Sequence, residues 1–208
     1  MVLKIGPSKA YDGINWLYLR LLLTHLGFNY SFIRWILGCI SNVSFFVLIN
    51  GVASPFFKSQ RGLKQGCPLS PLLFLLVAEG LSRLIHKARR AEKIKGIEVA
   101  INLFISHLLF VDDILIFSNG SHIELKEYKS IFDLFLKATG MQINSGKSQL
   151  CVAGFNRRES TLLSSLFPFQ IQALESPFKY LGFWLKPDSY KKEDWNWLIE
   201  KLETRISH

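Results

Sequence analysis

The sequence predicts an α+β protein in which short antiparallel strands are combined with amphipathic helices. Apolar residues recur at helical spacing in several segments, as in residues 16–27. Elsewhere, β-branched and aromatic runs flank turn-forming residues, most clearly at Asn50-Gly51, a dipeptide typical of a tight hairpin. No internal repeat or long linker divides the 208 residues, so we expect one main domain with a sizeable core.

Local signals mark the ends of most elements. Gly27 and Gly140 follow two helical patterns, where glycine favours the conformation that ends a helix. Ser31 is the expected N-cap of the second helix, and Pro68 opens a long helix with a basic last turn. In order, we expect helices at 16–27 and 31–40, strands at 44–49 and 52–59, a helix at 68–90, strands at 105–110 and 114–117, a helix at 122–139, strands near 141–143, 149–153 and 179–184, and helices near 157–166 and 191–207.

The composition is both basic and apolar. Lys and Arg total 25 against 16 Asp and Glu, which gives a formal charge of +9. At the same time 49% of the residues are hydrophobic, and the mean hydropathy is +0.21. Such a chain is too apolar to be disordered. Its charge indicates a polyanionic partner, either nucleic acid or an anionic membrane face.

The apolar stretches favour nucleic acid over a membrane. Residues 17–26 and 68–78 are shorter than the ~20 apolar residues that span a bilayer. Residues 99–118 carry two aspartates at their centre, which are costly in lipid. The N-terminus lacks the apolar core of a signal peptide. We therefore expect an intracellular protein of the nucleus or cytoplasm that is not secreted and has no membrane partner.

The cysteines and histidines predict no zinc site. Cys39, Cys67 and Cys151 are far apart, and no Cys or His pair has zinc-binding spacing. Buried or incidental thiols in a reducing compartment are the expected outcome.

Asp112 and Asp113 form the most informative pair in the sequence. They lie between two strongly apolar strands, where adjacent negative charges repel unless a cation neutralises them. Aspartate is also common in solvated turns, which is the simpler interpretation. Because both flanks lack polar residues, we expect this hairpin in the middle of a sheet, where the pair would hold a divalent metal.

Residues 61–71, RGLKQGCPLSP, carry the second signal. Two glycines, two basic residues and a glutamine stand just before the long helix. Glycine permits close approach of a ligand, and a helix N-terminus favours phosphate. The alternative is that this loop merely connects two elements.

Five segments read in order resemble the palm motifs of a reverse transcriptase, in particular those of plant non-LTR (LINE-type) retrotransposons. These segments are SKAYD (8–12) with Trp16, RGLKQGCPLSPLLF (61–74), HLLFVDDILIF (107–117), TGMQINSGKS (139–148) and FKYLG (178–182). The resemblance implies a palm with a small antiparallel sheet backed by helices. It also implies metal-dependent DNA synthesis with Mg²⁺, or with Mn²⁺ in its place, on an RNA template with a DNA primer and deoxynucleoside triphosphates.

The resemblance also implies roles for single residues, each with a simpler structural alternative. Tyr11 could be ordinary core, Lys147 a solvated loop lysine, and Tyr180 a packed strand aromatic. The implied roles are metal binding for Asp112 and Asp113, exclusion of a 2′-hydroxyl for Tyr11, nucleotide and template contact for Gln65 and Gly66, proton donation to pyrophosphate for Lys147, phosphate binding for Arg61 and Lys64, and a primer-gripping turn for Tyr180, Leu181 and Gly182.

Gly6 is the main departure from the family pattern. The first motif usually begins with a metal-binding aspartate at this position, and glycine has no side chain to bind a metal. Asp12 lies six residues further on and is expected not to reach back. Losing one metal ligand removes several kcal/mol of transition-state stabilisation, a loss of ~10³-fold or more in rate. We therefore expect impaired catalysis. Cys67, where an aspartate is frequent, is a milder change.

The resemblance also implies a partial polymerase. Residues 1–185 are expected to form a palm-like domain without the preceding fingers, and residues 186–208 the start of a truncated thumb or a connecting helix. Three alternatives stay open: a non-catalytic nucleic-acid-binding remnant that uses 61–64 and the basic helix end at 87–90, a degenerate product without function, and a membrane-surface protein, which the aspartate pair disfavours.

Overall fold

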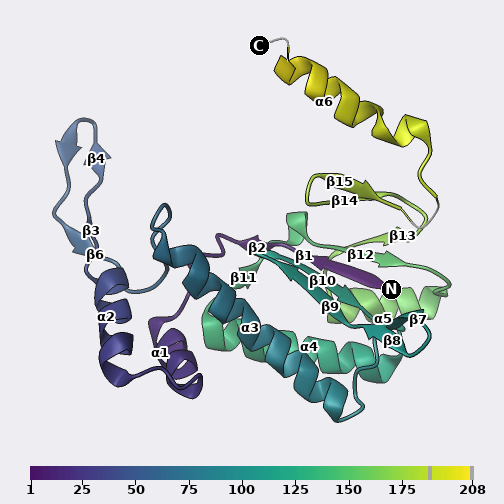
Figure 1. The fold of residues 1–208 in the computed structure, drawn as a ribbon, viewed down its shortest axis with the longest axis horizontal. Coiled ribbons are helices and arrows are strands. Elements are labelled where there is room, and N and C mark those ends of the chain that lie inside the picture. Colours follow the sequence, from purple (N-terminus) through teal and green to yellow (C-terminus); the bar gives the residue numbers. More distant parts are fainter. Residues whose placement is uncertain (187–188, 207–208) are drawn as a thin grey trace.

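The computed structural model describes residues 1–186 and 189–206 and has a five-stranded sheet at its centre (Figure 1). The strand order is β13-β12-β1-β10-β9, and neighbours are antiparallel except β12 and β13, which are parallel. The strands are β1 (Val2–Ile5), β9 (His107–Phe110), β10 (Asp113–Phe117), β12 (Gln149–Val152) and β13 (Gln170–Ala173).

Helices cover one face of this sheet. In β1 and β10, alternate residues such as Leu3, Ile5 and Ile116 point to this face and are almost fully buried against the helices. The buried Tyr128 of the second long helix donates a hydrogen bond to the carbonyl of Ser106, at the start of the β9–β10 hairpin. The helices of this layer are α1 (Trp16–His25), α3 (Leu69–Arg90), α4 (His122–Thr139) and α5 (Arg157–Leu166).

A small hairpin covers the opposite face. Its strands β14 (Phe178–Tyr180) and β15 (Phe183–Leu185) pack through Phe178 on the buried Leu115 of β10. The Lys4 ammonium of β1 donates to the carbonyl of Lys179 at 2.6 Å, which fixes the hairpin to the sheet.

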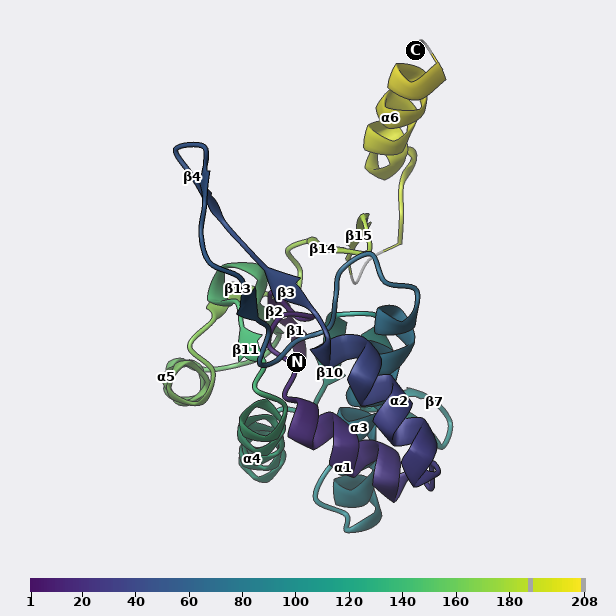
Figure 2. The same cartoon turned by 90° about the vertical axis from the view of Figure 1, so that its left-hand side faces the viewer.

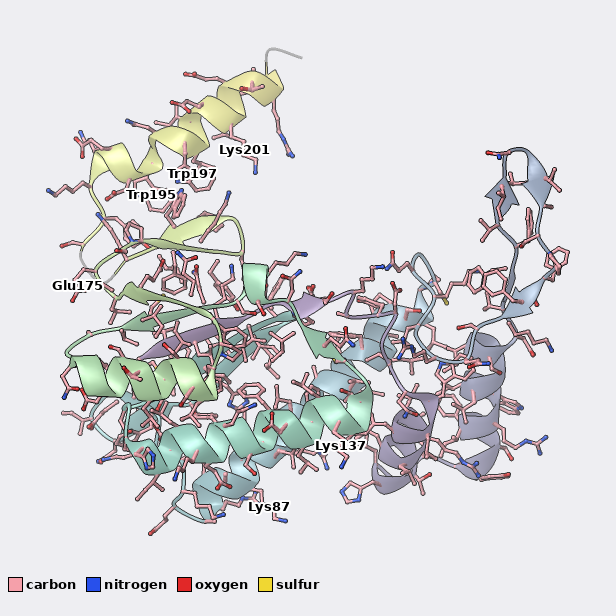
Figure 3. All side chains as sticks on the ribbon, turned by 180° about the vertical axis from the view of Figure 1, so that it is seen from behind. Lys87, Lys137, Glu175, Trp195, Trp197 and Lys201 are labelled. Atoms are coloured by element: carbon pink, nitrogen blue, oxygen red, sulfur yellow. The ribbon has the colours of Figure 1, made fainter. Side chains whose placement is uncertain are left out.

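The chain continues through η2 (Lys192–Trp195) into α6 (Asn196–Ile206). Figure 3 shows Trp195, the last residue of η2, and Trp197, near the start of α6, above the small hairpin. The ring of Trp197 contacts that of Phe183 edge-on at 5.7 Å.

Residues 43–59 form an arm that projects from the end of α2 (Tyr30–Ser41), away from the body of the molecule (Figures 1 and 2). Asn50 and Gly51 turn at its tip, both with positive φ. The arm contains β3 (Ser44–Phe45) paired with β6 (Phe57–Lys58) and β4 (Leu48–Ile49) paired with β5 (Val52–Ala53). The remaining elements are β2 (Pro7–Ser8), β7 (Ile97–Ala100), β8 (Leu103–Ile105), β11 (Gln142–Ile143) and η1 (Ser145–Lys147).

The α+β class and most of the expected elements are confirmed, and three details are wrong. Asn29, not Ser31, caps α2, because its side-chain oxygen accepts from the Ser31 amide at 2.8 Å. The aspartate hairpin is not wholly interior, since β9 is an edge strand. Residues 179–184 form parts of two strands, because the backbone turns at 181–182. Residue 207, the expected end of the last helix, lies outside the described residues.

Within the described ranges, α3 is the one helix long and apolar enough to cross a membrane by length and composition. In this structure it packs on α1 and α4, and eight of its residues are buried. The core helix of a soluble protein meets the same criterion, so α3 by itself is weak evidence for a membrane span.

Candidate active site

Gly6 and Asp113 lie side by side at one end of the sheet. Ile5 of β1 pairs with Ile114 of β10, and continuing this antiparallel register places Gly6 opposite Asp113. Residues paired in this way share a face, with Cα atoms roughly 4.5–5.5 Å apart. The position expected to carry the first acid therefore faces the aspartate pair, but it has no side chain.

The turn that presents the aspartates is strained. Val111 and Asp112 connect β9 to β10, and Val111 has a φ of 52°, where a β-branched residue is rare. Such strain often marks functional sites. Asp112 is exposed at this turn, whereas Asp113 is half-buried as the first residue of β10.

The turn at 144–148 packs directly against Gly6. The Asn144 amide donates to the Gly6 carbonyl at 2.9 Å, and the Gly6 amide donates to the buried Ser148 hydroxyl at 3.1 Å. A Cβ added at residue 6 would lie 2.7 Å from Cβ of Lys147, closer than such atoms normally approach. Lys147, the expected proton donor, thus stands next to the missing acid.

Tyr180 reaches the same end of the sheet from the small hairpin. Its pKa is raised, mainly by burial and further by the negative charge of Asp113. Leu181 and Gly182 form the turn that follows, and both have left-handed backbone angles. Tyr180 is therefore close enough to Asp113 to feel its charge, and Leu181 and Gly182 follow it in the turn.

Tyr11, Gln65 and Gly66 line one open cavity of about 540 Å³. The Tyr11 ring stacks on Phe74 of α3, with ring centroids 4.9 Å apart. Phe74 in turn lines a small crevice with Asp112, so α3 links the cavity to the aspartates. The nucleotide-binding candidates are therefore brought together.

Backbone contacts hold the 61–66 loop against the first motif. The Leu63 amide donates to the Tyr11 carbonyl at 2.8 Å, and the Trp16 indole donates to the Gly62 carbonyl at 2.7 Å. A Cβ at Gly62 would lie 2.8 Å from the Asp12 carbonyl oxygen, so glycine is required at this contact.

Asp12 faces this loop rather than the aspartate pair. Its carboxylate accepts a hydrogen bond from the Gln65 side chain at 3.3 Å, as expected for an acid that does not reach back. Asp12, Arg61 and Lys64 line a second cavity of about 640 Å³, which shares Lys64 and Gln65 with the first. This second cavity lies between the loop and the base of the arm.

Asp112 and Asp113 fit a divalent metal only in part. Across the described ranges, neither carboxylate forms an ion pair with a Lys, Arg or His side chain, so both are open to a hard cation. However, no cluster of three or more His, Cys, Asp or Glu side chains suited to a metal occurs within those ranges. The pair could hold a metal with water and ligand oxygens, but the third carboxylate is absent.

The two basic segments named by the sequence lie at opposite ends of α3. Residues 61–64 precede the N-terminus of α3, and the Lys87–Arg90 turn forms its C-terminal end. The 22 residues of α3 span about 33 Å at 1.5 Å per residue. Figure 3 shows Lys87 at the end of α3 that is remote from the arm. The two segments therefore belong to different surfaces.

His107 is a half-buried titratable residue of the aspartate hairpin, at the end away from the turn. It lies on β9, and its ring nitrogens are 3.0 Å from the hydroxyls of Ser82 and Ser106. Burial, followed by the charges of His86 and Arg89, lowers the pKa of His107 to about 4. The position of a histidine at the start of an apolar strand was its only signal in the sequence.

We expect His107 to lower the free energy of unfolding as the pH falls. In the unfolded chain its pKa is about 6.5, so between pH 6.5 and 4 only the unfolded state takes up the proton. Its stabilising effect is complete above pH 6.5 and is lost as pH falls towards 4. For a partly exposed ring we expect a loss on the order of 1 kcal/mol between pH 7.5 and 5.

Urea unfolding at these two pH values measures the effect. His107→Asn should show a smaller change in the free energy of unfolding than the unmodified chain. An exposed histidine provides the control, and His25→Asn should leave the pH dependence unchanged. Equal pH dependence of the unmodified chain and His107→Asn would contradict the expectation.

Solved telomerase structures share this fold. The telomerase of Candida albicans, in complex with a fragment of telomeric RNA, matches 98% of this chain and 34% of its own, with a TM-score of 0.56 and 13% identity. The apo telomerase of Candida tropicalis matches 71% of this chain and 29% of its own, with a TM-score of 0.52 and 17% identity. The sheet and its helices therefore form a polymerase palm-like fold.

The sequence has relatives among retrotransposon proteins. It is 25% identical over 190 residues to the transposon TX1 149 kDa protein of Xenopus laevis, covering 90% of this chain and 14% of the relative. It is 26% identical over 192 residues to the Pol polyprotein of the type-2 retrotransposable element R2DM of Drosophila melanogaster, covering 87% and 17%.

A plant relative is more similar over a shorter stretch. An uncharacterized mitochondrial protein of Arabidopsis thaliana is 46% identical over 67 residues, which are 32% of this chain and 55% of that protein. The chain thus spans 55% of this relative and less than a fifth of the two transposon proteins.

The family model for reverse transcriptase (RNA-dependent DNA polymerase) matches residues 1–185. The chain belongs to the reverse transcriptase family.

Proposed function

We propose that this chain is the palm of an RNA-directed DNA polymerase of a non-LTR retrotransposon, with catalysis impaired by Gly6. One observation carries the proposal. The sheet register and the 144–148 turn place Gly6, Asp113, Lys147 and Tyr180 at one end of the sheet. The proposed substrates are deoxynucleoside triphosphates, with an RNA template and a DNA primer. We also propose an intracellular location, in the nucleus or cytoplasm.

The residues at this site suit distinct tasks in nucleotidyl transfer. Asp112 and Asp113 would hold Mg²⁺ or Mn²⁺, which supplies charge stabilisation at the transferring phosphate. The Lys147 ammonium is suited to donate a proton to the leaving pyrophosphate. The Tyr11 ring, held by stacking on Phe74, narrows the nucleotide cavity where a 2′-hydroxyl would enter.

Other residues would hold the nucleic acid. Gln65 and Gly66 border the cavity on the loop side, where they would contact the nucleotide and the template base. Tyr180, Leu181 and Gly182 form the hairpin turn beside Asp113 and would position the primer end. Arg61 and Lys64 would bind template phosphates.

Primer extension by Gly6→Asp tests the proposal. We compare the unmodified chain with Gly6→Asp and Gly6→Asn on an RNA template with Mg²⁺ or Mn²⁺. Asparagine has the shape of aspartate but no charge. Each protein is assayed in two forms, once as residues 1–208 alone and once with a fingers region from a non-LTR relative fused before residue 1. Gly6→Asp should incorporate nucleotides faster than the other two, because only aspartate restores the negative ligand. Equal rates for all three, with extension that does not depend on Asp113, would overturn the proposal.

A non-catalytic nucleic-acid-binding role is the second candidate. The observation that favours it is the 144–148 turn, which occupies the space beside residue 6 where a third acid would stand. Salt-dependent binding of RNA by all three proteins, without incorporation by any of them, would favour this role.

A further inference from the structure

The segment between Asp12 and Glu79 contains no acidic residue. It comprises α1, α2, the arm and the 61–66 loop, and its charged side chains are all cationic: Arg20, Arg34, Lys58, Arg61 and Lys64. The chain's 16 Asp and Glu residues therefore all lie outside it. A lobe with one sign of charge is electrostatically complementary to a polyanion and is a poor match for a basic protein surface.

The base of the arm carries two pairs of exposed phenylalanines. Phe45 contacts Phe57 with centroids 6.0 Å apart, and Phe46 contacts Phe56 at 5.3 Å. Phe45 is 46% exposed and Phe46 is 49% exposed. The first pair belongs to the paired strands β3 and β6, whereas Phe46 and Phe56 lie in the stretches between the two strand pairs of the arm.

Phe45 shares a cavity with two cationic side chains. Phe45, Arg61 and Lys64 line the 640 Å³ cavity, whereas Phe46 does not. The cavity also contains Asp12, whose carboxylate is bound to the Gln65 side chain. An aromatic ring beside two cations is the arrangement that binds single-stranded nucleic acid by stacking and phosphate contact.

The cavity adjoins the proposed nucleotide cavity. Lys64 and Gln65 line both, and Tyr11 lies on the far side. A strand that placed one base opposite the incoming nucleotide would therefore place an adjacent base near Phe45. Its phosphate would lie near Lys64.

We propose that the cavity at the base of the arm binds one nucleotide of a single strand, with its base stacked on Phe45 and its phosphate held by Arg61 and Lys64. The inference rests on the proposed function, in which this strand is the template ahead of the copied base. The inference adds Phe45, an arm residue outside the five motifs, to the proposed nucleic-acid interface.

Anisotropy of a fluorescein-labelled 12-nucleotide oligouridylate tests the inference. The full chain is titrated in EDTA without nucleotides, so binding is measured apart from catalysis. Phe45→Leu should weaken binding by at least ~5-fold, since one base–aromatic stack contributes about 1–3 kcal/mol. Phe46→Leu is the matched control and should stay within about twofold. Circular dichroism melts establish that both variants are folded.

Salt dependence and self-association complete the test. Arg61→Gln with Lys64→Gln should lower the magnitude of the slope of log affinity against log salt by about 0.7, the value expected for the loss of one phosphate contact. Equal effects of Phe45→Leu and Phe46→Leu on binding would overturn the inference. It would also be overturned if both variants abolished self-association in sedimentation experiments without changing RNA affinity, because the arm would then be a protein interface.

The inference and the proposed function fail separately. If Gly6→Asp extends primers while Phe45→Leu binds the single strand normally, only the inference is overturned. If Phe45→Leu weakens binding while all three residue-6 proteins extend primers at equal rates without dependence on Asp113, the cavity is supported and the polymerase proposal is overturned.

Discussion

Glu124→Gln is expected to lower the free energy of unfolding by about 3 kcal/mol, because it disrupts a saturated buried carboxylate. Glu124 is 2% exposed. One oxygen accepts from the amides of Lys95 and Gly96 at 2.5 and 2.8 Å. The other accepts from the Asn119 amide at 2.8 Å and from the Ser118 hydroxyl. The glutamine side chain would turn an NH₂ group towards two of these donors.

Urea unfolding at pH 7.5 measures this change, and Glu127→Gln is the matched control. Glu127 lies on the same helix and pairs with Lys93 at 3.2 Å at the surface. Such an exposed pair contributes about 0–1 kcal/mol. A loss for Glu124→Gln as small as that for Glu127→Gln would show that the buried carboxylate does not hold α4 to the end of β10.

Glu124 also illustrates what the sequence could predict. Ser121 and Glu124 have the spacing of a capping box, and the helix over 122–139 was predicted with the bounds that α4 has. The Ser121 hydroxyl does accept from the Glu124 amide at 3.4 Å. The carboxylate, however, bonds to the loop at 95–96 and to residues 118–119 just before the helix, instead of to the cap. Only the packing of α4 against β10 determines which groups this carboxylate contacts.

The sheet was harder to predict than the helices. The hairpin around the aspartates was predicted, because two apolar runs flank it. β1 and β13 were not predicted, since each has only four residues and pairs with strands far away in the sequence. The same long-range pairing places Gly6 opposite Asp113, so the sequence indicated a missing acid without giving its neighbours.

The candidate site was predicted through motif order, and the structure supplied its spatial grouping. Tyr11, Gln65 and Gly66 share a cavity although more than fifty residues separate the first from the others. Phe45 was not predicted to belong to the site, because nothing in its local pattern distinguishes it from Phe46. Only the fold of the arm over the 61–65 loop separates the two.

Restoring the acid at residue 6 is expected to raise the rate of primer extension by up to ~10³-fold, the amount expected from one more metal ligand. The structure predicts a smaller gain for Gly6→Asp alone. Its Cβ would stand 2.7 Å from Cβ of Lys147 and 3.2 Å from the Lys147 carbonyl oxygen. The 144–148 turn must therefore move outwards before the carboxylate can face Asp113.

Gly6→Ala isolates the steric part of this expectation, because it adds the Cβ without a charge. We expect a loss of about 1–3 kcal/mol in the free energy of unfolding, as for other overpacked sites. The loss should be smaller in a Lys147→Gly background, so that the double-mutant cycle shows a coupling between the two positions. Additive losses would mean that the turn does not press on residue 6, and the full rate gain would then be expected from Gly6→Asp alone. Coupled losses would mean that the full rate gain requires a further change in the 144–148 turn that leaves the Lys147 ammonium in place.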